Sequence, residues 1–233
     1  MSSKSSPQVF TDVSADPFVR GLLHHPASNN SRALVLTHGA GSNCQAPLLI
    51  ALAETFADAG FTVLRCDLPY RQDRPYGPPG PGDAKRDRAG LKNALAALKN
   101  LVSGGVFLGG HSYGGRQASM LCAELPENAG ENAPAEVAGL LLLSYPLHPP
   151  RKPEQLRTQH LFHLRTPTLL VHGTRDPFGS ISEIEQALKL IPAKTKLLPV
   201  EGTGHDLGFK GKAARKDLSA NVLGEFQTFF FLE

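Results

Sequence analysis

Three residues of the chain are of types that together perform nucleophilic chemistry: Ser112, Asp176 and His205, in that order. A serine hydroxyl is a weak nucleophile at neutral pH and needs an adjacent base, for which imidazole is suited. The imidazole in turn needs a carboxylate that holds its tautomer and stabilises its protonated form. We therefore asked whether the chain can bring these three side chains together.

Ser112 lies at the centre of Gly110-His111-Ser112-Tyr113-Gly114, which matches the pattern G-x-S-x-G. The apolar run 106–108 before it predicts a buried strand, and residues 117–123 after it suit a helix. A serine at such a strand-to-helix turn has strained backbone angles, so side chains two positions to either side would collide with the strand and the helix. The pattern alone also fits a glycine-rich turn without a catalytic role. Whether Ser112 is catalytic therefore depends on the presence of a suitable base and carboxylate elsewhere in the chain.

His205 is the predicted base because it follows the last predicted strand, 196–200, in a loop rich in glycine. The other histidines have different expected places. We expect the side chain of His111 to point away from the site, and His172 to support the loop that carries Asp176. The pairs His24-His25 and His160/His163 lack a third ligand at a suitable spacing, so the sequence predicts no metal site and no cofactor.

Asp176 follows a predicted strand at 168–171, and it lies between Ser112 and His205 in the chain, as strand–turn–helix serine sites of this kind require. Two other aspartates are alternatives for the carboxylate partner. Asp67 precedes Ser112 and is expected to hold its own loop by hydrogen bonding. Asp206 directly follows His205 and would need an awkward bend to reach the outer imidazole nitrogen.

Acyl transfer also needs backbone N–H groups that face the oxyanion of the tetrahedral intermediate. Tyr113, directly after Ser112, is one expected donor. The second should come from the loop His38-Gly39-Ala40-Gly41 after the strand 33–37, and we favour Ala40, since the glycines permit unusual backbone angles. The same loop lacks the third glycine and the acidic residue of a dinucleotide site.

Strands and helices alternate along most of the chain, which predicts an α/β fold: a mostly parallel sheet with helices on both faces. The carboxyl ends of parallel strands form one edge, where ligands bind, so His38, Ser112, Asp176 and His205 should meet there. The predicted strands are 9–13 and 18–23 as an antiparallel edge, then 33–37, 61–65, 106–108, 137–144, 168–171 and 196–200. The predicted helices are 45–59, 83–102, 117–123, 181–191 and 221–230.

Two long loops are expected to form the walls of the pocket: residues 67–82, which show no periodicity, and the crossover from Tyr145 to Pro153. The full crossover, 145–166, has room for at most one helix, so no large lid is expected. Arg71, Arg74 and Arg151 lie on these loops and could bind an acidic acyl group, unless they are solvated surface arginines.

Composition narrows the class of protein further. The chain has 233 residues, a net charge of +3 and mixed charges, which give no nucleic-acid footprint; the basic run 210–216 suits a solvated helix face. Three cysteines without a pattern predict no disulfide framework and a reducing compartment, so we expect a cytoplasmic protein. No secretory signal or membrane-length run is visible. Residues 1–7 are expected to be a flexible tail, and residues 8–233 one domain.

Four motifs resemble those of the α/β-hydrolase superfamily: His38-Gly39-Ala40-Gly41, Gly110-His111-Ser112-Tyr113-Gly114-Gly115, Gly173-Thr174-Arg175-Asp176-Pro177 and Gly204-His205. The chain is most similar to the small, lidless, dienelactone-hydrolase-like members, and within them to predicted hydrolases that include a testis-expressed protein and a chromatin-complex subunit. The resemblance runs from about Ala33 onward and implies a Ser-His-Asp triad of Ser112, Asp176 and His205. Dienelactone hydrolases proper carry cysteine where this chain has Ser112.

The sequence therefore predicts a serine hydrolase that cleaves carboxylic esters of a small-molecule acyl substrate through an acyl-enzyme. The same triad could act on peptide, amide or thioester bonds. A binding or scaffold protein that keeps the fold is a further alternative, although such a protein has no need of all three residues.

Overall fold

The computed structural model describes residues 6–26, 31–124, 137–209 and 217–232. It contains an eight-stranded sheet in the order β1-β2-β4-β3-β5-β6-β7-β8. Most of the predicted tail and the basic run at 210–216 lie outside the described residues.

The first two strands form the antiparallel edge that the sequence predicts: β1 (Gln8–Asp12) pairs with β2 (Val19–His24), and β2 pairs with β4 (Thr62–Cys66). The other strands pair in parallel. They are β3 (Ala33–Thr37), β5 (Val106–His111), β6 (Val137–Leu143), β7 (Thr168–Gly173) and β8 (Thr195–Val200). β3, β4 and β7 are buried along their whole length, as expected for strands of a parallel sheet that is covered on both faces.

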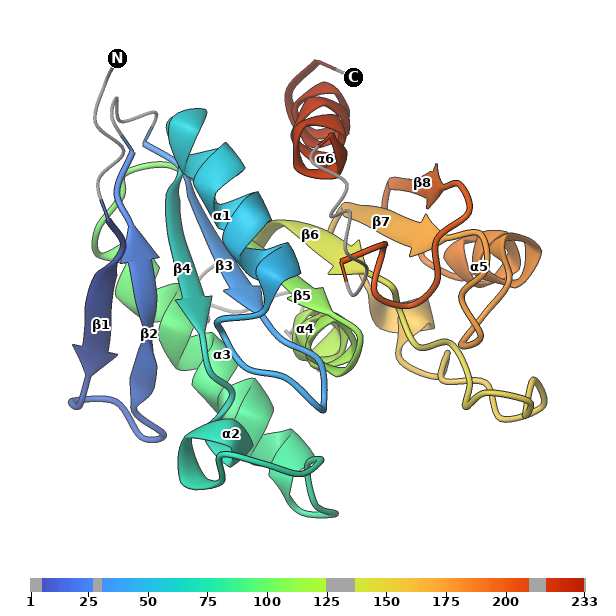
Figure 1. Ribbon diagram of the computed structural model, residues 1–233, viewed down its shortest axis with the longest axis horizontal. Coiled ribbons are helices and arrows are strands. Elements are labelled where there is room, and N and C mark those ends of the chain that lie inside the picture. The colour runs from blue at the N-terminus through green and yellow to red at the C-terminus, as the bar shows by residue number, and fades with distance from the viewer. Residues whose placement is uncertain (1–5, 27–30, 125–136, 210–216, 233) are drawn as a thin grey trace.

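Helices cover both faces of the sheet, each over a separate hydrophobic core. One core contains the apolar side chains of α1 (Pro47–Asp58) and α6 (Leu218–Gln227), with several phenylalanines packed edge to face. The other contains those of α3 (Asp83–Lys99), α4 (Tyr113–Glu124) and α5 (Ile181–Leu188). In Figure 1, α1 crosses in front of β3 and β4, and α3 lies behind them. The predicted α/β architecture is confirmed.

Local signals account for several helix ends. Pro47 is at the start of α1, where its missing N–H costs no hydrogen bond, and Gly60 follows α1 with a φ of 97°. At α5, Ser180 and Glu183 form a capping box. The C-terminal helix begins earlier than expected and continues as a π-helix, Thr228–Leu232.

The prediction of a loop without regular structure at 67–82 is wrong in one respect, because this segment contains a short helix, α2 (Pro69–Asp73). A helix of five residues is too short to show a 3.6-residue period. The connection from β6 to β7 has no helical insertion apart from a 3₁₀ turn, η1 (Leu161–His163), so no lid domain lies between these strands.

Candidate active site

Ser112 lies at a sharp turn between β5 and α4, with a φ of 51°. The close approach of strand and helix explains the two flanking glycines. A Cβ atom on Gly110 would lie 2.5 Å from the backbone nitrogen of Gly115, and one on Gly114 would lie 2.5 Å from the carbonyl oxygen of His38. The predicted reason for glycine at both positions is therefore confirmed. The turn places the hydroxyl at the positive end of α4.

His205 lies in the loop after β8, between the other two candidate residues. Its Nε2 atom is 2.7 Å from Ser112 Oγ, and its Nδ1 atom is 2.8 Å and 3.1 Å from the two carboxylate oxygens of Asp176. A carboxylate only accepts, so we assign the proton to Nδ1, which leaves Nε2 to accept from the serine hydroxyl. Three loops that are distant in sequence thus bring the three predicted side chains into one hydrogen-bonded chain.

Asp176 follows β7, and its side chain is fully buried. Besides His205, the carboxylate accepts the backbone N–H of Phe178 at 2.9 Å. The Phe178 ring lies 4.2 Å from the His205 ring, at an interplanar angle of 32°. The carboxylate and the aromatic ring together restrict the imidazole to the orientation that faces Ser112.

His172 supports the Asp176 loop, as the sequence predicts. Its Nε2–H donates to the carbonyl of Gly179 at 2.8 Å and lies 3.7 Å from the Asp176 carboxylate. Burial lowers the pKa of His172, although the nearby Asp176 charge opposes that shift. The loop is therefore held by a neutral histidine.

His111 contradicts our expectation that its side chain points away from the site. It lines the cavity beside Ser112, and its Nε2–H donates to the carbonyl oxygen of His205 at 2.8 Å. Burial lowers the pKa of His111 to about 4, so the ring is neutral. The alternation of side chains along β5 ends at the positive-φ turn at Ser112, so it does not determine where His111 points. The ring of His205 lies 5.2 Å from the ring of His111. A contact between two loops far apart in sequence leaves no signal in the local pattern.

The two expected oxyanion donors both lie next to Ser112. Ala40 is in the loop after β3 and lines the same cavity; within the described part of the chain, its N–H has no hydrogen-bond acceptor. Tyr113 is the first residue of α4. The loop and the turn touch, since a Cβ atom on Gly39 would lie 3.3 Å from the Cβ of Ser112. An oxyanion bound between the two N–H groups would be close to the serine.

The two rejected aspartates have other contacts. Asp67 accepts the backbone N–H of Cys44 at 2.8 Å, so it holds the loop after β3 rather than the loop that it begins. Asp206 lines the cavity and accepts the backbone N–H of Gly208 at 3.2 Å. The outer nitrogen of His205 bonds to Asp176 instead of Asp206.

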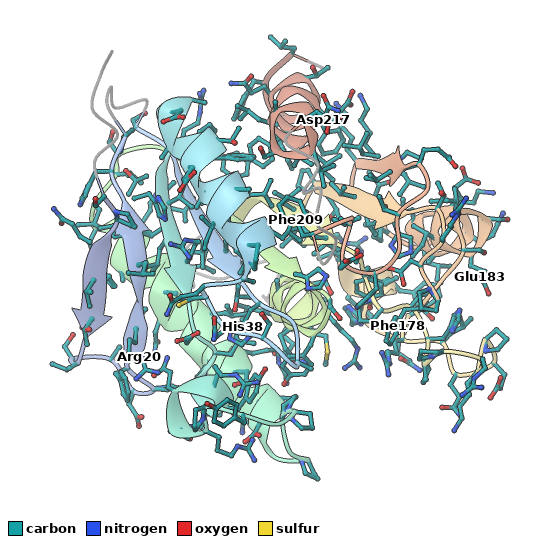
Figure 2. All side chains as sticks on the ribbon, in the orientation of Figure 1. Arg20, His38, Phe178, Glu183, Phe209 and Asp217 are labelled. Atoms are coloured by element: carbon teal, nitrogen blue, oxygen red, sulfur yellow. The ribbon has the colours of Figure 1, made fainter. Side chains whose placement is uncertain are left out.

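The cavity beside Ser112 has a volume of about 380 Å³. Its walls are the loop 38–42, the start of α1 at 46–49, and the rings of Phe178 and Phe209. In Figure 2, His38, Phe178 and Phe209 come from three different loops. The expected walls, 67–82 and Tyr145–Pro153, do not line this cavity, so that prediction is wrong. The side chains of α2 donate instead to backbone carbonyls of the 38–42 loop.

The three loop arginines also lie outside the cavity lining. Arg71 is buried and donates to the carbonyls of Ala40, Ser42, Arg74 and Gly77. Arg74 pairs with Asp83, and Arg151 is exposed. None of them is placed to bind an acyl group in this cavity.

The histidine pairs and the cysteines have ordinary structural contacts. His24 accepts from Arg65 Nε at 2.9 Å, and His160 lies 2.8 Å from Ser119 Oγ. No group of three or more potential metal ligands occurs among the described residues. Burial raises the pKa of the Cys44 and Cys122 thiols to about 12, so they remain protonated at neutral pH.

The sheet order, the sharp turn at Ser112 and the three converging loops define an α/β hydrolase fold. A family model described as an alpha/beta hydrolase domain matches residues 30–227, and the chain belongs to this family. Among the described residues, no helix is both long and apolar enough to cross a bilayer.

Solved structures agree with this fold over nearly the whole chain. The dienelactone hydrolase from Anabaena variabilis is 22% identical, with a TM-score of 0.70, and the match covers 97% of this chain and 100% of that one. Est1E from Butyrivibrio proteoclasticus is 16% identical, with a TM-score of 0.71, over 98% of this chain and 100% of that one. XC6422 from Xanthomonas campestris is described as a serine hydrolase without a lid. It is 14% identical, with a TM-score of 0.70, and the match covers 97% of this chain and 96% of that one. At these identities, the likeness shows a common fold.

Proposed function

We propose that the protein is a serine hydrolase that cleaves carboxylic esters, with Ser112, His205 and Asp176 as its catalytic triad. One observation carries this proposal: the hydrogen-bonded chain from Ser112 Oγ through both nitrogens of His205 to a buried Asp176 carboxylate. Such a chain activates a hydroxyl at neutral pH.

The reaction would proceed in two acyl transfers. Ser112 Oγ attacks the ester carbonyl while its proton moves to His205 Nε2, and Asp176 stabilises the resulting imidazolium. The tetrahedral intermediate collapses, the bond to the leaving alkoxide breaks, and His205 returns the proton to that oxygen. A water molecule, deprotonated by His205, then attacks the acyl-enzyme. The bond from the acyl carbon to Ser112 Oγ breaks, His205 returns the proton to Oγ, and the carboxylic acid leaves.

The negative charge of each tetrahedral intermediate would be bound by the N–H groups of Ala40 and Tyr113. Donors that are already oriented stabilise this charge without reorganising during the reaction. The position of Tyr113 at the N-terminus of α4 adds the favourable end of the helix dipole.

The substrate we propose is a small, uncharged ester with an apolar acyl or alcohol group. A cavity of about 380 Å³ is at the lower end of the range for small-molecule sites, and Leu48, Leu49, Phe178 and Phe209 provide apolar walls. Related folds bind comparable ligands: one solved structure shows ferulic acid bound to Est1E, and another shows esterase 2 of Thermogutta terrifontis phosphorylated by paraoxon.

The remaining expectations are also proposals. Free, buried thiols at Cys44, Cys66 and Cys122 suit a reducing compartment, and we propose the cytoplasm. We propose no nucleic-acid or membrane partner and no cofactor. Kinship with the testis-expressed and chromatin-subunit homologues rests on the sequence motifs alone.

The test is hydrolysis of para-nitrophenyl esters from acetate to decanoate by the wild type and by Ser112→Ala. We expect wild-type turnover with a preference for short or medium chains, and loss of turnover in Ser112→Ala by about 10⁴-fold or more, as for other triad serines. Equal rates of the two proteins would exclude Ser112 as the nucleophile. No turnover of any ester would reject the ester proposal.

A further inference from the structure

A buried carboxylate that the triad does not use lies behind the proposed oxyanion donors. Asp87, on α3, is fully buried. Its Oδ2 atom accepts the hydroxyl of Tyr113 at 2.7 Å, and its Oδ1 atom accepts the backbone N–H of Tyr70 at 3.1 Å. Burial raises the pKa of Asp87, and these two hydrogen bonds oppose that shift. A carboxyl group is costly to bury, so both partners are needed to hold it there.

The first partner leads to one oxyanion donor. Tyr113 is the first residue of α4, and its own backbone N–H is the donor next to Ser112. Its hydroxyl bond to Asp87 fixes the first turn of α4 against α3. The Tyr113 ring also packs edge to face on Tyr70, with 5.8 Å between centroids.

The second partner leads to the other donor. The hydroxyl of Tyr70 lies 2.8 Å from the carbonyl oxygen of Ala40 and 3.3 Å from that of Gly39, which shares a peptide with the Ala40 N–H. Arg71 Nη2 donates to the Ala40 oxygen at 3.1 Å. The preceding carbonyl, that of Gly39, accepts His38 Nδ1–H at 2.9 Å, and His38 Nε2 accepts the backbone N–H of Leu68.

The geometry of the peptide bond relates the contacts of the Gly39 carbonyl to the direction of the Ala40 N–H. In a trans peptide, the carbonyl and the N–H point in opposite directions. Because the Gly39 carbonyl faces both His38 Nδ1–H and the Tyr70 hydroxyl, the Ala40 N–H in the same peptide points away from these two groups. A carbonyl that accepts hydrogen bonds also polarises its peptide, which strengthens the N–H as a donor.

We propose that Asp87 is a positioning residue that couples the two oxyanion donors, through Tyr113 to one and through Tyr70 to the other. This inference rests on the proposed ester hydrolysis. Neither tyrosine hydroxyl touches the reacting atoms. Their removal should loosen donors that act mainly in the transition state, so kcat should fall while KM stays nearly constant.

The experiment measures kcat and KM for para-nitrophenyl butyrate in Tyr70→Phe, Tyr113→Phe and the double variant. Each single change should lower kcat about tenfold, with KM within about twofold, as expected for loss of one hydrogen bond's orientation. The double variant should lose less than the product of the two single losses, because both changes break one coupled unit.

Tyr145→Phe is the matched control. Tyr145 is as buried as Tyr70, and its hydroxyl donates to the carbonyl of Arg157 at 2.7 Å, outside this set of contacts. It should lose stability by a similar amount but keep its kcat. Asp87→Asn retains an oxygen acceptor and should keep more kcat than Asp87→Ala, when both are compared at temperatures where thermal unfolding shows them folded.

The outcomes separate the two proposals. If the wild type hydrolyses the ester but the tyrosine variants match Tyr145→Phe in kcat, the coupling through Asp87 is wrong and the ester proposal stands. Multiplicative losses in the double variant would also reject the coupling. If the wild type hydrolyses no ester, both proposals fail.

Discussion

The triad side and the oxyanion side of the candidate site are built by different means. On the triad side, the functional groups are side chains that bond directly to one another: Ser112 to His205, and His205 to Asp176. On the oxyanion side, the groups that we propose are the backbone N–H groups of Ala40 and Tyr113. A backbone N–H has no rotamers of its own, and we propose that the buried side chains behind these two groups orient them.

This difference has a consequence for reading function from sequence. A side chain that performs chemistry must be of a particular type, so it leaves a motif. A backbone N–H can come from any residue except proline, and the residues that orient it lie elsewhere in the chain. Substitutions on the two sides should therefore differ in their effects, and the largest effect is expected on the triad side.

Asp176→Asn should lower kcat by about 10⁴-fold with little change in KM, because an amide neither holds the Nδ1–H tautomer nor stabilises the imidazolium. Steady-state ester hydrolysis measures this loss. Asp206→Asn is the control, since Asp206 also lies next to His205 but does not bond to its Nδ1 atom. A greater loss in Asp206→Asn than in Asp176→Asn would show that Asp206, and not Asp176, is the carboxylate partner of His205.

Acidification should destabilise the fold between about pH 6.5 and pH 4. His111 has a pKa of about 4 in the folded protein and about 6.5 when unfolded, so the unfolded state binds the extra proton in this range. Stability therefore falls as pH falls, by about 3 kcal/mol at pH 4 for this residue alone. Burial lowers the pKa of His38 as well, which acts in the same direction.

Urea unfolding at pH 7, 5.5 and 4.5 measures this effect. His111→Phe has no titrating group at this position, so its stability should depend less steeply on pH than that of the wild type. Parallel pH dependences of the two proteins would show that His111 is not held neutral by the fold.

His111→Phe should also lower kcat by about tenfold, because the carbonyl oxygen of His205 loses its donor and the His205 loop gains freedom. His111→Gln can supply an amide donor and should recover part of the loss. Ester hydrolysis by the two variants, at a pH where both are folded, measures the difference. Full activity of His111→Phe would mean that Asp176 and Phe178 alone position the imidazole.

The smallest expected effect concerns the loop arginines. Arg74→Ala and Arg151→Ala should change kcat/KM by less than about twofold for neutral and carboxylate-bearing esters alike, since exposed charges outside the cavity contribute little. Matched pairs of esters that differ only in a terminal carboxylate provide the measurement. A loss of kcat/KM for the acidic ester alone would show that these arginines bind the carboxylate of the substrate.

Much of the fold could be predicted from the sequence, because strong periodic signals survive without knowledge of tertiary contacts. The apolar runs gave the buried parallel strands, and the strand-to-helix pattern around Ser112 gave the turn with its two required glycines. Chain order and strand ends were enough to select Asp176 and His205, which the structure brings together with Ser112.

The parts that could not be predicted depend on contacts between segments distant in sequence. His111 reaches the backbone of His205 only because two loops fold together. Arg71 is of a type that can bind an acidic substrate. In the structure, however, a five-residue helix buries it against the carbonyls of Ala40 and Ser42. Asp87 lies in an amphipathic helix among charged neighbours, where nothing in the pattern separates a buried aspartate from a solvated one.

Covalent labelling with a fluorophosphonate, followed by peptide mapping by mass spectrometry, tests the central claim most directly. The account predicts one adduct on the wild type, located on Ser112, with none on Ser112→Ala and greatly slowed labelling of His205→Ala. An adduct on another residue, or labelling of Ser112→Ala at the wild-type rate, would contradict it.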